Sequence, residues 1–143
     1  MRRQTDDESG FSLIELLIVV GVIGIIAAIA VPMLMNAIDR SKQRRTMGDM
    51  HSMVTANGTY KVDNQEYAPA LADLVGNEYL QVLVNDDAWG NPFEYSTNDD
   101  SYTLTSRGRD GAAGPAPPVP WVNNPFEPDI IIVDGVFTQA PAG

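Results

Sequence analysis

A long uncharged apolar stretch near the N-terminus dominates the pattern of hydrophobic and polar positions. Residues 16–35 read LLIVVGVIGIIAAIAVPMLM, and the apolar character extends back to Phe11 with only Ser12 and Glu15 as interruptions. As a helix, the 20 residues of this stretch span about 30 Å, the hydrocarbon thickness of a bilayer. The pattern therefore predicts a membrane helix, a signal peptide, or a segment that passes through the membrane on its way elsewhere.

Beyond Pro32 the hydrophobic period changes twice. Met47, Met50 and Val54 recur at three- and four-residue spacing, which predicts that the helix resumes and reaches about Tyr60 with one apolar core face. Shorter alternating segments, separated by Gly, Pro, Asn and Asp, then predict strands and turns. The elements expected after residue 60 are a short helix near 70–74, an antiparallel hairpin of 93–95 and 102–106, and late strands at 129–133 and 136–138. The predicted fold is α+β, with one long N-terminal helix packed on a small antiparallel sheet.

Charge is unevenly distributed along the chain. The 143 residues carry 9 basic and 19 acidic side chains, a formal net charge of −10, which argues against nucleic acid binding. Residues 36–45, the basic segment, hold four basic side chains against Asp39, a net of +3. Residues 46–143 hold three basic against 14 acidic side chains, a net of −11. The basic segment either marks the end of a membrane helix with solvated charges or meets acidic parts of neighbouring copies.

The residues that most enzymes and metal sites depend on are scarce. The chain has no cysteine, which excludes disulfides, thiol nucleophiles, iron–sulfur clusters and zinc held by cysteine. His51 is the single histidine and is interpreted as an ordinary polar helix residue. The sequence predicts that the protein is not an enzyme, and a membrane-anchored enzyme or binding module is the weakest interpretation.

Two ordinary explanations compete for the apolar stretch. A signal peptide would be cleaved after Ala30 in the Ala28-Ile29-Ala30 sequence, but the apolar run is too long and continues past that site. A single-span anchor explains the length and tolerates Glu15, because the side chain can snorkel and a helix N-terminus favours an acid. Neither explanation accounts for the placement of Glu15.

The residues themselves suggest a third explanation. Gly10-Phe11-Ser12-Leu13-Ile14-Glu15, with the run to Pro32, resembles the N-terminus of type IV prepilins and type II secretion pseudopilins. The resemblance implies that residues 1–10 are a leader, which prepilin peptidase removes by cutting between Gly10 and Phe11. Phe11 would then be N-methylated, and residues 11–35 would stay as the membrane and filament-core helix.

The same resemblance implies roles in assembly. Glu15 would pair with the N-terminal amine of a neighbouring subunit, because a carboxylate in a filament core of low dielectric is costly unless it is paired. Gly24, with Ala28, has the small-residue spacing that allows close helix packing. Pro32 removes one helical hydrogen bond, and in this family the stretch between the equivalents of Gly24 and Pro32 can lose its helical structure in assembled filaments.

Residues 36–143, the predicted globular part, resemble one branch of the family, the major pseudopilins of type II secretion. The resemblance lies in the D-x-W-G-N-P segment at 87–92, the hairpin, and the SRGRDG sequence at 106–111. In that branch a loop binds calcium through oxygen ligands, which here implies Asp110, Asp129 and the Arg107 carbonyl. The alternative is that Asp110 lies in a simple turn and Asp129 is a charge at a strand edge. The proline-rich loop at about 112–128 departs from the branch and is expected to be extended, with Trp121 and Phe126 against the globular part or a neighbour.

The implied function is structural. The chain is expected to polymerise into a type IV pilus-like filament, as the major pseudopilin of a type II secretion system; the alternative is a major or minor type IV pilin for adhesion, motility or DNA uptake. Expected partners are further copies, prepilin peptidase, an inner-membrane assembly platform, and minor pilins or pseudopilins. The resemblance places a single-pass protein in the bacterial inner membrane with its globular part outside, and later a periplasmic or cell-surface filament. The count of two basic residues in the leader against four in the basic segment would favour the opposite orientation.

Overall fold

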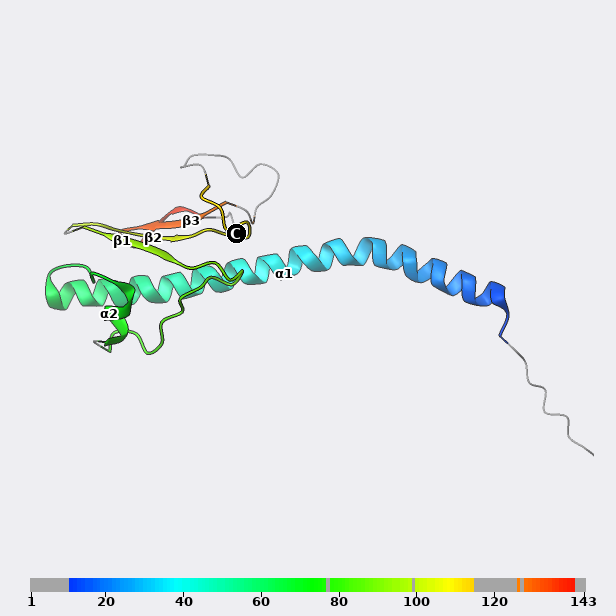
Figure 1. Ribbon diagram of the computed structural model, residues 1–143, viewed down its shortest axis with the longest axis horizontal. Helices are drawn as coiled ribbons and strands as arrows, with labels where there is room; N and C mark the ends of the chain where they lie inside the picture. The colour runs from blue at the N-terminus through cyan, green and yellow to red at the C-terminus, as the bar shows by residue number, and fades with distance from the viewer. Residues whose placement is uncertain (1–10, 77, 99, 115–125, 127, 141–143) are drawn as a thin grey trace, which may run out of the picture. The chain divides into compact units, whose positions relative to one another are not determined.

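The fold consists of one long helix, one short helix and a four-stranded antiparallel sheet (Figure 1). The computed structural model describes residues 11–76, 78–98, 100–114, 126 and 128–140. The expected leader, Gly10, Trp121 and most of the proline-rich loop lie outside the described residues. The elements are α1 (Leu13–Asn64), α2 (Leu71–Gly76), β1 (Glu94–Thr97), β2 (Tyr102–Ser106), β3 (Ile130–Val133) and β4 (Val136–Gln139). The α+β prediction is confirmed.

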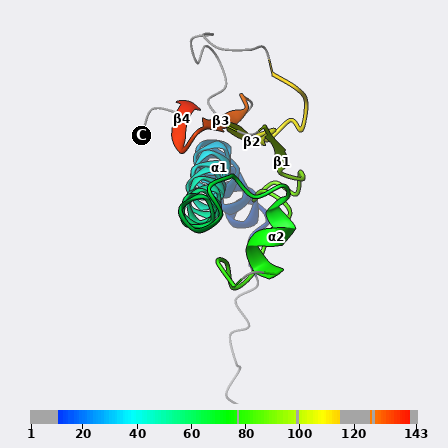
Figure 2. The ribbon, with the colours of Figure 1, turned by 90° about the vertical axis from the view of Figure 1, so that its left-hand side faces the viewer.

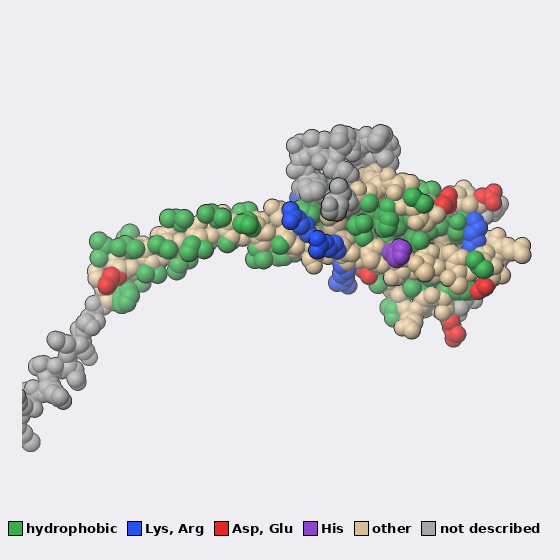
Figure 3. All heavy atoms as spheres, turned by 180° about the vertical axis from the view of Figure 1, so that it is seen from behind, with side chains coloured by type: hydrophobic (Ala, Val, Ile, Leu, Met, Phe, Trp, Pro, Cys, Tyr) green, Lys and Arg blue, Asp and Glu red, His purple; other side chains and the backbone are tan. Residues whose placement is uncertain are grey.

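Helix α1 contributes to both compact units of the chain, Met1–Ile38 and Asp39–Gly143. In the first unit every described residue of the helix is exposed, although its most apolar 18-residue window has a mean hydropathy of 2.9. The helix is continuous through Pro32. An apolar helix that the described residues leave uncovered (Figure 3) needs lipid or other protein surfaces to cover it.

In the second unit α1 has one buried face. Met50 and Met53 are fully or almost fully buried, and Met47 and Val54 pack against the same cluster. The predicted apolar face is therefore confirmed, and the helix ends at Asn64, four residues beyond the predicted end. His51 is exposed, as expected of a polar helix residue.

The sheet covers this buried face of α1 (Figure 2). Its strand order is β1-β2-β3-β4 and each neighbouring pair is antiparallel. Along β2 the buried side chains alternate, Tyr102, Leu104 and Ser106, as expected of a strand with one face toward a core. Leu104 lies opposite Tyr95 of β1 and Ile132 of β3, so the predicted hairpin and the late strand β3 share one apolar layer.

The turn between β3 and β4 is set by two residues. Asp134 and Gly135 both have positive φ values, 51° and 82°, which is the conformation of a type I′ hairpin turn. The Asp134 carboxylate also accepts hydrogen bonds from Tyr102 N and Ser101 Oγ. This turn therefore fixes the end of the β3–β4 hairpin against the start of β2.

Helix α2 packs against a second cluster, on a different side of α1 from the sheet (Figure 2). Leu74 of α2 is fully buried with Ala56, Tyr60 and Ala68. The side-chain oxygen of Asn57 in α1 accepts a hydrogen bond from Ala68 N, and its side-chain nitrogen donates one to the Tyr95 hydroxyl. This asparagine therefore ties the loop before α2 and strand β1 to the same turn of α1.

Candidate functional site

Helix α1 begins with a capping box. Ser12 Oγ accepts a hydrogen bond from Ile14 N at 3.3 Å, and Ser12 N donates to Glu15 Oε2 at 2.9 Å. The reciprocal arrangement satisfies two amide groups that the helix itself leaves without partners. Glu15 is exposed within this chain. Its carboxylate therefore has a local role at the helix start and remains accessible to a further cation.

The other residues expected to act in assembly also lie on the exposed helix of the first unit. Phe11, the expected new N-terminus, is 77% exposed. A side chain added at Gly24 would meet no described atom within 4 Å, so the helix surface is open at that point. Pro32 lies inside the helix without ending it.

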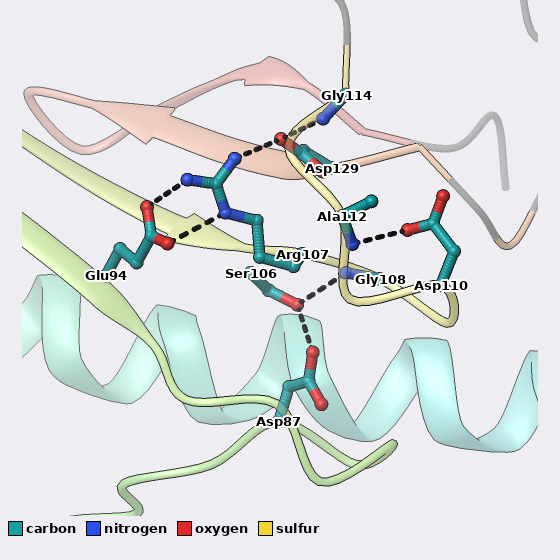
Figure 4. Close-up of polar contacts among 9 residues, drawn as sticks. All are labelled: Asp87, Glu94, Ser106, Arg107, Gly108, Asp110, Ala112, Gly114 and Asp129. Atoms are coloured by element: carbon teal, nitrogen blue, oxygen red, sulfur yellow. Dashed lines mark hydrogen bonds and ion pairs between the residues drawn. The ribbon is translucent and has the colours of Figure 1, made fainter.

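A buried aspartate organises the D-x-W-G-N-P segment. Asp87 is 5% exposed, and its Oδ1 accepts hydrogen bonds from Trp89 N and Asn91 N, both at 2.9 Å. Its Oδ2 accepts from Ser106 Oγ at 2.7 Å, as Figure 4 shows. Asn91 extends the network by donating to the Gly108 carbonyl at 2.6 Å. The segment thereby holds the end of β2 and the loop that follows.

Arg107 connects β1 to the residue before β3 (Figure 4). Its guanidinium makes two contacts with the Glu94 carboxylate and one with Asp129 Oδ2, at 3.2 Å. Gly114 N donates to the same Asp129 oxygen at 3.1 Å. Asp129 is almost fully buried, and its Oδ1 has no hydrogen-bond partner in the described part of the chain.

The expected calcium ligands, Asp110 and Asp129, both belong to this loop region (Figure 4). Asp110 is exposed and its Oδ1 accepts a hydrogen bond from Ala112 N at 3.1 Å. Burial raises the pKa of Asp129 above its ordinary value, although Gly114 N and Arg107 oppose the shift. The described residues contain no group of three or more His, Cys, Asp or Glu side chains placed to hold a metal ion, so a calcium site here would need backbone carbonyls.

Sequence reasoning missed a third polar cluster. Asp39 in the basic segment is only 8% exposed; its carboxylate pairs with Arg109 Nη1 at 3.0 Å and accepts from Trp89 Nε1 at 3.3 Å. Its position as the single acid among four basic residues was the available signal. The basic segment is therefore not uniformly solvated.

Phe126 of the proline-rich loop contacts the globular part. This side chain is 5% exposed, and its carbonyl accepts a hydrogen bond from Arg109 N at 2.9 Å. Of the two alternatives for Phe126, the structure supports packing against the globular part.

Two family models match the chain. The model "Prokaryotic N-terminal methylation motif" matches residues 6–31. The model "Type II secretion system (T2SS), protein G" matches residues 33–118, which is more than half of the chain. The two matches adjoin, and together they cover the apolar helix, the sheet's first hairpin and the loop that contains Arg107 and Asp110.

Individual relatives agree with the models. Type II secretion system core protein G of Pseudomonas aeruginosa is 34% identical over 129 residues, covering 78% of this chain and 90% of the relative. The core protein G of Escherichia coli is 31% identical over 130 residues, covering 78% and 89%. The type IV major fimbrial protein FimA of Dichelobacter nodosus is 42% identical, but over 73 residues, covering 51% and 47%. No solved structure gave a significant match.

Proposed function

The chain belongs to the type II secretion system protein G family, and from this premise we propose that it is the major pseudopilin of a type II protein secretion system. In this role it is a structural subunit, not an enzyme, that polymerises into a periplasmic filament. The observation that carries the proposal is the protein G match across the globular part, together with an apolar helix that the described part of the chain leaves exposed.

A secretion assay tests the proposed function. Deleting the gene should stop export of type II substrates, and the unmodified gene should restore it. Surface motility, adhesion and DNA uptake should be unchanged. The fimbrial relative supports the alternative of a type IV pilin, but over only about half of this chain. Normal secretion combined with lost surface pili would favour that alternative.

We propose that prepilin peptidase cuts between Gly10 and Phe11 and that Phe11 becomes N-methylated. The methylation motif over residues 6–31 supports this processing. Before cleavage the protein would lie in the bacterial inner membrane with residues 36–143 outside the cytoplasm. Its other proposed partners are the inner-membrane assembly platform and minor pseudopilins.

Mass spectrometry of the protein purified from membranes should identify the processed N-terminus. We expect a chain that starts at Phe11 and carries one extra methyl group. A Gly10→Val variant should keep the leader, because a branched side chain replaces the residue that precedes the cut. A chain that starts at Val31 would indicate ordinary secretion, and an intact Met1 would indicate a plain anchor; either result would contradict the proposal.

Assembly is proposed to depend on Glu15, Gly24 and Pro32. After cleavage, the amine of Phe11 lies one helical turn from Glu15, and the exposed carboxylate can pair with the amine of a neighbouring copy. The open surface beside Gly24 allows close approach of a second helix. Pro32 supplies a position where one helical hydrogen bond is absent, so the helix can open there on assembly.

We also propose that the loop after β2 binds calcium through Asp110, Asp129 and the Arg107 carbonyl. Asp129 Oδ1 is buried and has no hydrogen-bond partner among the described residues. This supports the fit, because a cation would satisfy the oxygen and stabilise an ionised carboxylate that burial disfavours. Bound calcium would supply a crosslink between the loop and the start of β3. In a chain without cysteine, this crosslink would take the place of a disulfide.

Calcium should raise the thermal stability of the globular part. At a hundredfold excess over the dissociation constant, the added stability is about 2.7 kcal/mol. The test compares melting with calcium and with a chelator, in the unmodified chain and in Asp110→Asn as the ligand variant. Asp100→Asn, at an exposed turn, is the matched control and should keep the response. Equal melting temperatures for the unmodified chain in both buffers would refute the site.

A further inference from the structure

One pocket lies on the flank of α1 in the second unit. It has a volume of about 450 Å³ and is bounded by α1 and the segment of residues 79–84. About half of its wall is apolar, from Met53, Leu80, Val82 and Val84, and the other half is polar. Val82 is 72% exposed, which leaves an uncovered apolar rim.

A carboxylate stands beside the apolar side chains of this pocket. Asp49 lines the pocket, and its Oδ2 is buried without a hydrogen-bond partner in the described part of the chain. The nearest cation is Arg45 on the preceding turn, whose Nε lies 3.7 Å away, too far for a hydrogen bond. The Arg45 side chain is 71% exposed, so it stays in solvent and does not cover the Asp49 carboxylate. The pocket therefore offers an acceptor with unused capacity.

Two arginines of the basic segment stand elsewhere on the same helix. Arg40 and Arg44 are one turn apart, both are exposed, and neither makes a hydrogen bond or ion pair with another described residue. At 100° per residue, Arg44 lies about 140° around the helix from Asp49, and Arg40 about 180°. They therefore face away from the pocket of their own chain. We call this pair the arginine stripe.

We propose that the Asp49 pocket binds the arginine stripe of a second copy of this chain. The pocket suits an arginine because the apolar walls can cover the alkyl stem while the carboxylate receives the guanidinium. The charges are complementary, since residues 36–45 carry a net +3 and residues 46–143 a net −11. The proposal rests on the proposed filament function and names one contact within it.

The contact has the symmetry that a filament needs. The stripe and the pocket are different surfaces of one chain, so pairing one with the other is heterologous and leaves each end of a dimer free to bind again. The contact also gives the basic segment a role beyond marking the end of a membrane helix. Its strength should fall as salt screens the partly exposed charges.

Cysteine crosslinking tests the contact directly, because the native chain has no cysteine. One variant combines Ser52→Cys at the pocket with Arg44→Cys, and a second combines Ser52→Cys with Arg40→Cys; each keeps one stripe arginine. Within one chain, positions 44 and 52 are about 12 Å apart along the helix, beyond disulfide reach. Oxidising assembled filaments should therefore give a ladder of multimers from at least one pair. Single-cysteine variants can give only dimers.

A control pair separates this contact from general proximity. Arg44→Cys with Thr59→Cys uses an exposed position on α1 outside the pocket lining and should give no ladder. Filaments visible by electron microscopy without a ladder from either pocket pair would overturn the inference and leave the proposed function standing. An unmodified chain that forms no filaments would instead count against the proposed function.

Charge reversal provides a second test. Asp49→Arg should lower filament yield about tenfold, because it places like charges together at every contact. Adding Arg40→Asp and Arg44→Asp to that variant should restore most of the yield. Glu66→Arg reverses an exposed acid away from the pocket and should assemble normally, with circular dichroism confirming that each variant is folded. Equal yields for Asp49→Arg and Glu66→Arg would overturn the inference.

Discussion

Replacing Glu15 by alanine should abolish filament assembly and leave residues 39–143 folded. In a filament core of low dielectric, the charged amine of Phe11 would lose its partner, and breaking a buried ion pair costs about 3–5 kcal/mol. Even the lower figure reduces the equilibrium constant for adding each subunit by more than about a hundredfold, and this loss is repeated at every subunit. Electron microscopy and sedimentation of sheared material would measure the loss.

The capping box requires a second variant to isolate the charge. In the structure Glu15 also accepts a hydrogen bond from Ser12 N, and losing a cap costs only about 1 kcal/mol. Glu15→Gln keeps an acceptor for the cap but removes the charge. If the ion pair matters, Gln should fail as completely as Ala. If Gln assembles normally, the carboxylate acts only as a helix cap and the proposed pairing is wrong.

The elements of the fold were predictable because each has a local signal. The spacing of Met47, Met50 and Val54 identified the buried face of α1, and strict alternation in residues 102–106 identified β2. Gly and Pro near residue 90 correctly marked the turn before β1. The proposed N-terminal processing site also rests on a motif that is contiguous in the sequence.

The polar clusters were not predictable, because their members come together only through the fold. Asp39 and Arg109 are 70 positions apart, and Asp87 and Ser106 are 19 apart. Asp39 stands out as the single acid of the basic segment, but no local pattern shows that it is buried while the arginines around it are exposed. The partnership of Arg107 with Glu94 and Asp129 likewise depends on the pairing of β1 with β2 and of β2 with β3.

This distinction bears on the candidate calcium ligands. Their positions came from a resemblance, which identifies residue types but does not show that Arg107 already pairs with Asp129. A divalent cation at Asp129 would share the carboxylate with that guanidinium, so like charges would lie close together. The two contacts to Glu94 give Arg107 an alternative partner, which allows Asp129 to turn toward calcium without leaving the arginine unpaired.

The largest loss of stability in the globular part should come from Asp87→Ala. The substitution removes the acceptor for Trp89 N, Asn91 N and Ser106 Oγ, and Ser106 is fully buried. Leaving buried donors without partners should lower the free energy of unfolding by about 3 kcal/mol or more. Urea unfolding of the full chain in detergent, followed by tryptophan fluorescence, measures this change, because both tryptophans lie beyond residue 38.

Two variants make the result specific. Asp100→Ala removes an exposed carboxylate at the β1–β2 turn and should change stability by less than about 0.5 kcal/mol. Asp87→Asn keeps one oxygen acceptor but replaces the other with an amide donor. Its loss of stability should lie between those of Asp100→Ala and Asp87→Ala. Asp87 holds the loop of Trp89, whose indole donates a hydrogen bond to Asp39. Removing the Asp87 carboxylate should therefore also alter the tryptophan fluorescence of the folded state. A stability equal to that of Asp100→Ala would mean that water replaces the carboxylate at no cost and that the network does not hold the loops.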